Sequence, residues 1–171
     1  VQEVTVAAYI EMIAGKTAAL LSAAVAIGAL LGGAEERVVE EFATYGTALG
    51  LSFQAVDDIL GIWGDASVTG KSAATDILTR KKTLPVLYAL AWERERGLSD
   101  LAELYARPDM HQEDVPHVLT LLDRAGARQY TETWADRQQA QALAHLRATG
   151  LPHPARDTLQ ELTLSLLHRI S

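Results

Sequence analysis

The sequence has 171 residues, of which 49% are hydrophobic, and its 15 basic and 22 acidic residues give a net charge of −7. This length and apolar content allow a sizeable core, so we expect one domain or a large part of one. The negative charge argues against binding to nucleic acid, and the absence of cysteine excludes disulfides and thiolate metal sites. We therefore expect a cytoplasmic protein in which an anionic ligand meets a local basic cluster.

The segments between chain breakers are rich in Ala, Leu, Glu, Gln and Arg, which predicts an all-α protein. Glycines at 32 and 33 are expected to end the first helix, and those at 61, 64 and 70 predict a loop after the second. Helical apolar spacing predicts helices at about residues 5–31, 35–60, 73–78, 84–92, 101–105, 115–125, 130–147 and 154–170.

The last of these segments carries one apolar stripe, formed by Leu159, Leu162, Leu166 and Ile170. Apolar residues at this spacing lie on one face of a helix and usually pack on a core. We expect this stripe to be core packing.

Residues 17–34 carry no charge, and this stretch approaches the length of a membrane span. Most of its residues are Ala and Gly, which contribute little free energy of insertion into lipid. Small residues instead suit a helix that is buried on several sides within a bundle. We therefore expect a buried helix and no integral membrane segment.

Two adjacent carboxylates, Asp57 and Asp58, stand near the end of the second long helix. Their apolar neighbours Phe53 and Val56 indicate that this helix is half buried, and an unpaired charge beside a core is costly. Gln54 lies one turn earlier and shares an edge of the helix with the carboxylates. That edge suits Mg²⁺, which typically takes one or two protein carboxylates and completes its shell with water and phosphate oxygens.

Basic residues follow and precede this acidic pair. Lys16-Thr17 stands just before the uncharged stretch, Lys71 follows the loop glycines, and Arg80-Lys81-Lys82 precedes a further helix. If these cations converge on Asp57, the site combines carboxylates with cations, as expected for a metal-bridged polyphosphate.

Taken in order, these motifs resemble the polyprenyl synthase family, the trans-isoprenyl diphosphate synthases. The matching residues are Tyr9 to Ile13, Lys16-Thr17-Ala18, Phe53-Gln54, Asp57-Asp58, Gly64-Asp65, Thr69-Gly70-Lys71, Asp76 and Lys82 to Pro85. They cover roughly the first half of the chain, and an ordered set is far more specific than any single motif. The resemblance is greatest to bacterial short-chain synthases of the geranylgeranyl or farnesyl type.

The resemblance implies a helical bundle of the isoprenoid synthase type, incomplete in this chain, in which two aspartate-rich motifs face each other across an apolar cavity. It also implies a Mg²⁺-dependent prenyltransferase that condenses an allylic diphosphate with isopentenyl diphosphate. A homodimer is expected for the full-length enzyme.

By this resemblance Asp57 would ligate one Mg²⁺, and Asp58 would support that ion through its water shell. Gln54 would face the reacting allylic carbon. Phe53 and the alanine-rich wall after Thr17 would line the cavity.

The resemblance also assigns roles to the cations. Lys16 and Lys71 would hold the leaving diphosphate, Thr17 would contact the same region, and Lys81 would lie nearby as a supporting charge. Such groups stabilise the charge that develops on the diphosphate as it ionises, which is electrostatic rather than nucleophilic catalysis.

This sequence departs from the family pattern in two ways. Gly61 stands where the second acidic motif often has a third aspartate, and Asp65 would replace it only if the loop turned back. The first acidic motif is absent. We therefore interpret residues 1–171 as the C-terminal part of one domain, inactive alone, with the diphosphate and magnesium motifs in 1–96 and further helices in 97–171.

Three other functions deserve comparison. A nucleotide-binding P-loop at Gly64 to Ser72 is disfavoured because five residues, not four, separate Gly64 from Gly70, and because a helix precedes it. A class I terpene cyclase would use the same diphosphate chemistry. A non-catalytic helical subunit of a synthase would not need the acidic and basic site residues.

Overall fold

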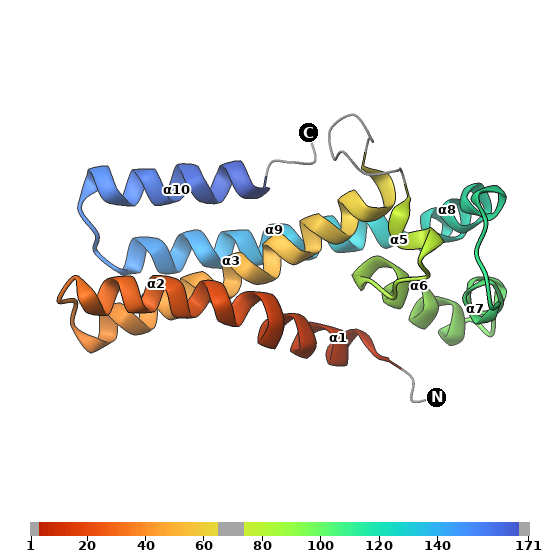
Figure 1. Cartoon of the computed structure of the whole chain (residues 1–171), viewed down its shortest axis with the longest axis horizontal. Helices are drawn as coiled ribbons and strands as arrows, with labels where there is room; N and C mark the ends of the chain where they lie inside the picture. The colour runs from red at the N-terminus through yellow and green to blue at the C-terminus, as the bar shows by residue number, and fades with distance from the viewer. Residues whose placement is uncertain (1–3, 65–73, 168–171) are drawn as a thin grey trace. The chain divides into compact units, whose positions relative to one another are not determined.

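The computed structural model describes residues 4–64 and 74–167, and this part of the chain is helical without any strand (Figure 1). The all-α prediction is confirmed, and each expected helix is present with its ends shifted by a few residues. The elements in chain order are α1 (Val6–Ile13), the π-helix η1 (Ala14–Ala18), α2 (Ala19–Leu31), α3 (Glu36–Trp63), α5 (Thr75–Leu78), α6 (Leu84–Glu95), α7 (Asp100–Ala106), the 3₁₀-helix η2 (Gln112–Asp114), α8 (Val115–Arg124), α9 (Ala127–Ala148) and α10 (His153–Leu167).

The chain divides into two compact units. Unit 1 comprises Val1–Tyr9 and Asp57–Thr133, and unit 2 comprises Ile10–Val56 and Trp134–Ser171. Helices α1, α3 and α9 each contribute residues to both units. From the sequence we expect a different division, into residues 1–96 with the diphosphate and magnesium motifs and residues 97–171 with further helices. That division stays a prediction.

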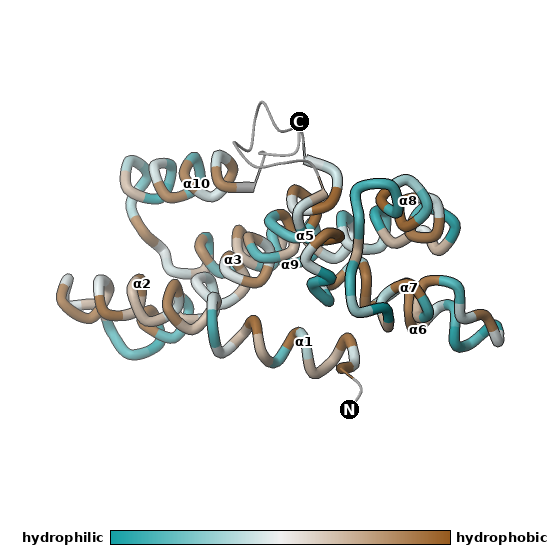
Figure 2. Tube along the Cα trace, turned by 45° about the vertical axis from the view of Figure 1, so that its right-hand side comes forward, coloured by the Kyte–Doolittle hydropathy of each residue, from teal (hydrophilic) through white to brown (hydrophobic). Residues whose placement is uncertain are grey.

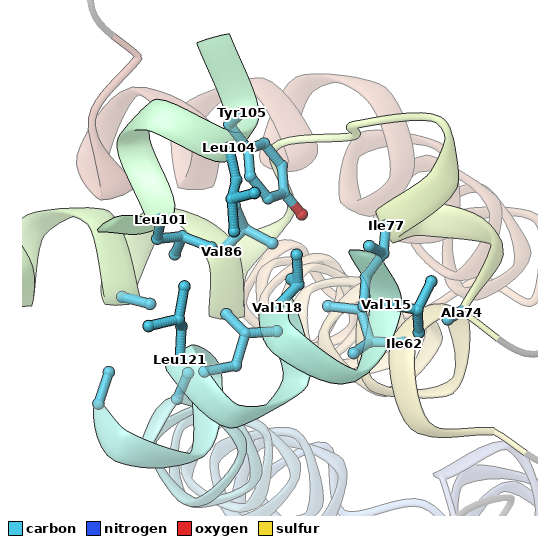
Figure 3. Close-up of a cluster of buried hydrophobic side chains, with 14 of the residues drawn as sticks. Ile62, Ala74, Ile77, Val86, Leu101, Leu104, Tyr105, Val115, Val118 and Leu121 are labelled. Atoms are coloured by element: carbon cyan, nitrogen blue, oxygen red, sulfur yellow. The ribbon is translucent and has the colours of Figure 1, made fainter. Parts of the chain in front are cut away.

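The core of unit 1 is built by short helices that follow one another in the chain. Side chains of α6, α7 and α8 point toward one another in Figure 3, and Val86, Leu101 and Val118 have no exposed surface. Helix α6 starts with Leu84-Pro85, and proline suits a first helical turn because the N–H it lacks would have no helical partner there.

In unit 2, α3 packs closely on η1 and α2. A Cβ atom at Gly46 would lie 2.6 Å from the Cα of Ser22, and one at Gly50 would lie 2.5 Å from the Cα of Ala18. Only glycine allows the two backbones to approach this closely. The Ser22 hydroxyl also donates to the Ala43 carbonyl at 2.8 Å. These contacts fix the position of η1 against α3.

The expectation that the uncharged stretch is buried on several sides is wrong for this structure. No residue of α2 is buried, and Leu20 and Leu31 are 72% and 83% exposed. The tube in Figure 2 shows apolar residues along most of this helix. Among the described residues, the close contact of α2 is with α3, at Ser22 and Gly46.

Residues Val6–Leu31 are long and apolar enough to cross a membrane, and only 11% of their most apolar 18-residue window is buried. A single helix of this kind is weak support for a membrane span, because a helix belonging to a soluble bundle has the same length and hydropathy.

The predicted apolar stripe of the last helix packs only in part: Leu159 and Leu166 are half buried, but Leu162 is 49% exposed. Among the described side chains of α10, the buried one is that of Thr163. Its hydroxyl is 2.8 Å from that of Tyr45 on α3, so this polar contact sets the inner face of α10. Ile170 lies outside the described residues.

Candidate functional site

Lys16 and Thr17 lie on the π-helix η1 (Ala14–Ala18), which interrupts an otherwise α-helical run. Single π-turns of this kind occur often at functional sites because they change the direction of side chains on a helix. Lys16 is exposed and makes no hydrogen bond or ion pair with the described residues. Thr17 is half buried, and its hydroxyl donates to the side-chain carbonyl of Gln54 at 3.0 Å.

The contact between Thr17 and Gln54 follows from the glycine positions on α3. Gly50 lies one turn before Gln54 and lets the backbone of α3 touch Ala18, the residue after Thr17. Two predicted site residues are thereby brought together within unit 2. Phe53, beside Gln54, is half buried, and its role in lining a cavity stays a prediction.

Asp58 lies in unit 1 and has no exposed surface. One of its oxygens, Oδ2, accepts hydrogen bonds from the Tyr9 hydroxyl at 2.6 Å and from the Leu84 backbone N–H at 3.1 Å. The Lys81 ammonium is 3.8 Å from the other oxygen, Oδ1. Burial and the neighbouring Asp58 carboxylate raise the pKa of Tyr9, so its hydroxyl remains protonated and donates.

Asp57 has a different environment from its neighbour. Its side chain is half buried, and it forms no hydrogen bond or ion pair with the residues that the structure describes. Consecutive helical side chains point about 100° apart, so one carboxylate of the pair faces the interior while the other does not. The two carboxylates therefore differ: the buried Asp58 is bound by protein donors and a cation, whereas Asp57 can bind a ligand.

The described residues contain no group of three or more acidic or histidine side chains able to hold a metal ion by themselves. Mg²⁺ needs fewer, because it commonly binds one or two carboxylates and takes its other oxygens from water and phosphate. Asp57 therefore fits a Mg²⁺ that arrives with a phosphorylated ligand. With the described residues alone it does not form a metal site.

Asp76 explains why the chain has a glycine at position 61. The carboxyl carbon of Asp76 lies 2.6 Å from the place where a Cβ of residue 61 would be, so the Asp76 carboxylate fills that space. Its Oδ2 atom is 3.1 Å from the Lys81 ammonium. Asp65, the substitute that we considered from the sequence, lies outside the described residues.

The sequence predicts that the cations converge on Asp57. The structure places Lys81 between Asp58 and Asp76, and the convergence on Asp57 stays a prediction. Lys71 lies outside the described residues. Arg80 donates to the backbone carbonyl of Arg107 and so serves a loop contact. Sequence reasoning gave no role to Tyr9, although it belongs to the quoted motif, because nothing near it in the chain indicates a partner 49 residues away.

A pocket of about 520 Å³ in unit 1 does not coincide with these residues. Apolar side chains of α6, such as Leu87 and Leu90, line it together with Lys82 and Arg94. Lys82 belongs to the predicted basic cluster, but none of the residues to which the resemblance assigns a role lines this pocket. The pocket is therefore not the candidate site.

Comparison with known proteins supports the resemblance. The polyprenyl synthetase family matches residues 1–122. The chain is 43% identical over 145 residues to a geranylgeranyl diphosphate synthase of Mycobacterium tuberculosis, covering 84% of this chain and 41% of that protein. It is 35% identical over 163 residues to a (2E,6E)-farnesyl diphosphate synthase of Mycobacterium bovis, covering 94% and 45%.

Solved structures give the same result. A polyprenyl synthetase from Streptomyces coelicolor superposes with a TM-score of 0.88 at 40% identity, covering 96% of this chain and 51% of that one. A geranylgeranyl pyrophosphate synthase from Corynebacterium glutamicum, complexed with isoprenyl diphosphate and magnesium, gives 0.87 at 25% identity, covering 96% and 47%. The chain thus spans about half the length of its relatives. From its helical fold of the isoprenoid synthase type and its sequence match, the chain belongs to the polyprenyl synthetase family.

Proposed function

We propose that this chain supplies the diphosphate-binding part of a Mg²⁺-dependent trans-prenyltransferase, which condenses an allylic diphosphate with isopentenyl diphosphate. One observation carries the proposal: Asp57 is a half-buried carboxylate without a hydrogen-bond or ion-pair partner among the described residues, whereas the bonds of Asp58 are provided by protein. A half-buried, unpaired carboxylate favours a bound cation. The relatives named above are diphosphate synthases, one of them complexed with magnesium.

When bound, Mg²⁺ would neutralise charge on the diphosphate as the allylic carbon–oxygen bond breaks. Asp57 would hold the ion, and Asp58 would contribute its negative charge from the buried position in which Tyr9, Leu84 and Lys81 hold it. Lys16, which is exposed and unpaired among the described residues, would hold the leaving diphosphate together with Lys71. Lys81 would contribute positive charge from its position between Asp58 and Asp76.

Gln54 is held by the Thr17 hydroxyl, which donates to its side-chain carbonyl. This bond occupies the carbonyl oxygen of the Gln54 side-chain amide. The N–H₂ group is on the other side of the amide and points away from Thr17. We propose that Gln54 so oriented faces the reacting end of the allylic chain.

The exposed face of α2 supports the proposal of an apolar wall along the hydrocarbon part of the allylic substrate. Lys16, Leu20, Ala23, Ile27 and Leu31 are all exposed, and they follow one another at intervals of three or four residues, which places them on one helix face. A cation at one end of an apolar stripe suits a ligand with a diphosphate head and an isoprenoid tail. The stripe would also exclude water from the allylic cation.

The first test is calorimetric titration of the 171-residue chain with inorganic diphosphate, with and without Mg²⁺. We expect weak binding that requires Mg²⁺, and no condensation of prenyl substrates, because the first acidic motif is absent from this chain. Asp57→Ala should remove the gain in diphosphate binding that Mg²⁺ gives. Asp123→Ala, which removes an exposed carboxylate on α8, should leave that gain unchanged. Equal binding with and without Mg²⁺ would contradict a metal-bridged site.

The second test uses a complete enzyme, in which this chain follows the half of the family fold that it does not span. There Asp57→Ala should lower turnover by about 10²–10³-fold, since it removes a group that stabilises developing charge. A near-wild-type rate would disprove the metal assignment. Linear prenyl diphosphates as products would exclude a terpene cyclase, and activity dependent on Asp57 would exclude a non-catalytic subunit.

A further inference from the structure

Asp58 is a buried carboxylate whose partners come from different parts of unit 1. The Tyr9 hydroxyl is contributed by α1, and the Leu84 N–H is the first of α6, while Asp58 itself is on α3. An ionised carboxylate without solvent contact is stable only when donors or cations replace its water shell. These two donors therefore help to hold the carboxylate in its present orientation.

The bond from Tyr9 is the shorter of the two, 2.6 Å against 3.1 Å. Lengths of this order are typical of a hydroxyl that donates to a charged oxygen, and such bonds are roughly twice as strong as neutral ones. Tyr9 is only 4% exposed and Asp58 has no exposed surface, so solvent has little access to the bond. Both donors reach Oδ2, and the Lys81 ammonium lies 3.8 Å from Oδ1.

The second donor shows what Asp58 does for α6. Thr83, at the position that caps α6, makes no capping bond with its side chain, and its buried hydroxyl oxygen has no partner in the described structure. The carboxylate of Asp58 takes the place of that cap by accepting the N–H of Leu84. Negative charge is favourable at a helix N-terminus because of the helix dipole. One oxygen atom of Asp58 thus links Tyr9 of α1 to the first N–H of α6.

We propose that Tyr9 is a positioning residue: by holding Oδ2 of Asp58 it fixes the start of α6 and keeps Lys81 at a distance from the carboxylate. Without the Tyr9 hydroxyl, the Asp58 carboxylate turns toward the Lys81 ammonium, only 3.8 Å away, and neutralises more of the positive charge of Lys81. The start of α6 then loses its cap. The consequence for diphosphate binding rests on the proposed function above, whereas the effect on α6 does not.

The direct test is hydrogen exchange of the Leu84 amide, measured by NMR in the 171-residue chain. Tyr9→Phe should speed this exchange by about tenfold, because a hydrogen bond to a charged group is worth about one decade or more in an equilibrium. Tyr45→Phe is the matched control, since Tyr45 is equally buried but bonds the neutral hydroxyl of Thr163. Unchanged exchange in Tyr9→Phe, or an equal increase in both variants, overturns the proposal.

A double-mutant cycle with Asp58→Asn tests the same link without relying on one variant. Asparagine retains an oxygen for the Leu84 N–H but lacks the charge, so Tyr9→Phe should have a smaller effect on stability in that background. Strict additivity contradicts the link.

Calorimetry with inorganic diphosphate and Mg²⁺ then separates positioning from stability. Tyr9→Phe should weaken this binding by about tenfold, as the same bond is lost, while Tyr45→Phe should leave it unchanged. Equal affinity in the wild type and Tyr9→Phe overturns the effect on the ligand site. If the wild type itself does not bind, the proposed function fails, and the Leu84 exchange still decides the role of Tyr9.

Discussion

Helices α2 and α6 show how little apolar composition alone says about burial. They have similar lengths, 13 and 12 residues, and α2 contains no charged residue at all. Yet no residue of α2 is buried, whereas six are buried in α6, including the carboxylate-bearing Glu93. The difference lies in their neighbours within each unit, because α7 and α8 follow α6 in the chain and cover it, while α2 is closely packed only on α3.

The buried charge in α6 is stabilised in the same way as Asp58. Both oxygens of Glu93 accept the N–H of Leu101, at 3.1 and 3.0 Å, and Arg124 lies 3.3 Å from one of them. The Glu93 carboxylate lies at the start of α7, where the N–H group of the helix and a cation replace its solvent shell. A charged residue with such partners can be buried, whereas an uncharged helix that is closely packed on one face stays largely exposed.

The largest expected effect tests this contrast by matched leucine truncations. Leu84→Ala removes a side chain of α6 with no exposed surface and should lower the free energy of unfolding by about 3 kcal/mol. Leu20→Ala on α2, where the side chain is 72% exposed, should change it by less than about 0.5 kcal/mol. Urea denaturation followed by circular dichroism measures both. Similar losses would show that α2 is buried in solution.

A smaller effect separates the packed and open faces of unit 2. Gly50→Ala places a methyl group 2.5 Å from the Cα of Ala18 and should destabilise the chain by about 2 kcal/mol, since backbone must move. Gly28→Ala on α2 meets no atom within 4 Å and should stabilise the helix by about 0.5–1 kcal/mol. The two melting temperatures should move in opposite directions. A gain for Gly50→Ala would refute the close contact.

In unit 1, Gly61→Ala tests the place of the Asp76 carboxylate. The added methyl group collides with the end of a side chain rather than with backbone, so Asp76 can turn away at the expense of its ion pair with Lys81. We expect a loss of about 1 kcal/mol, mostly absent when Asp76→Ala is already present. The same cost in both backgrounds, measured by denaturation, would contradict the contact.

The smallest effect concerns the hydroxyl of Thr17. Thr17→Val keeps the shape but removes the donor to Gln54, and should cost about 1 kcal/mol of unfolding free energy or less. Thr44→Val, at an exposed position of α3 where the hydroxyl bonds only a backbone carbonyl of its own helix, is the control. Equal and negligible changes would mean that Gln54 is held by its other contacts.

Several features of the site could be predicted from the sequence because they depend on neighbours in the chain. The Asp57-Asp58 pair, the basic residues after Gly70 and the polar Lys16-Thr17 before an uncharged stretch are all local patterns. The division between the two aspartates could not be predicted. It depends on Tyr9 and Leu84, which are 49 and 26 residues from Asp58.

The sequence by itself determined the all-α class, the approximate helix positions and the family, because helical periodicity, chain breakers and motif order are properties of consecutive residues. Tertiary structure alone decided which apolar helix is buried, why Gly61 faces Asp76 and which aspartate of the pair is saturated. Each of these depends on atoms brought together by packing from distant segments, and no local pattern specifies such partners.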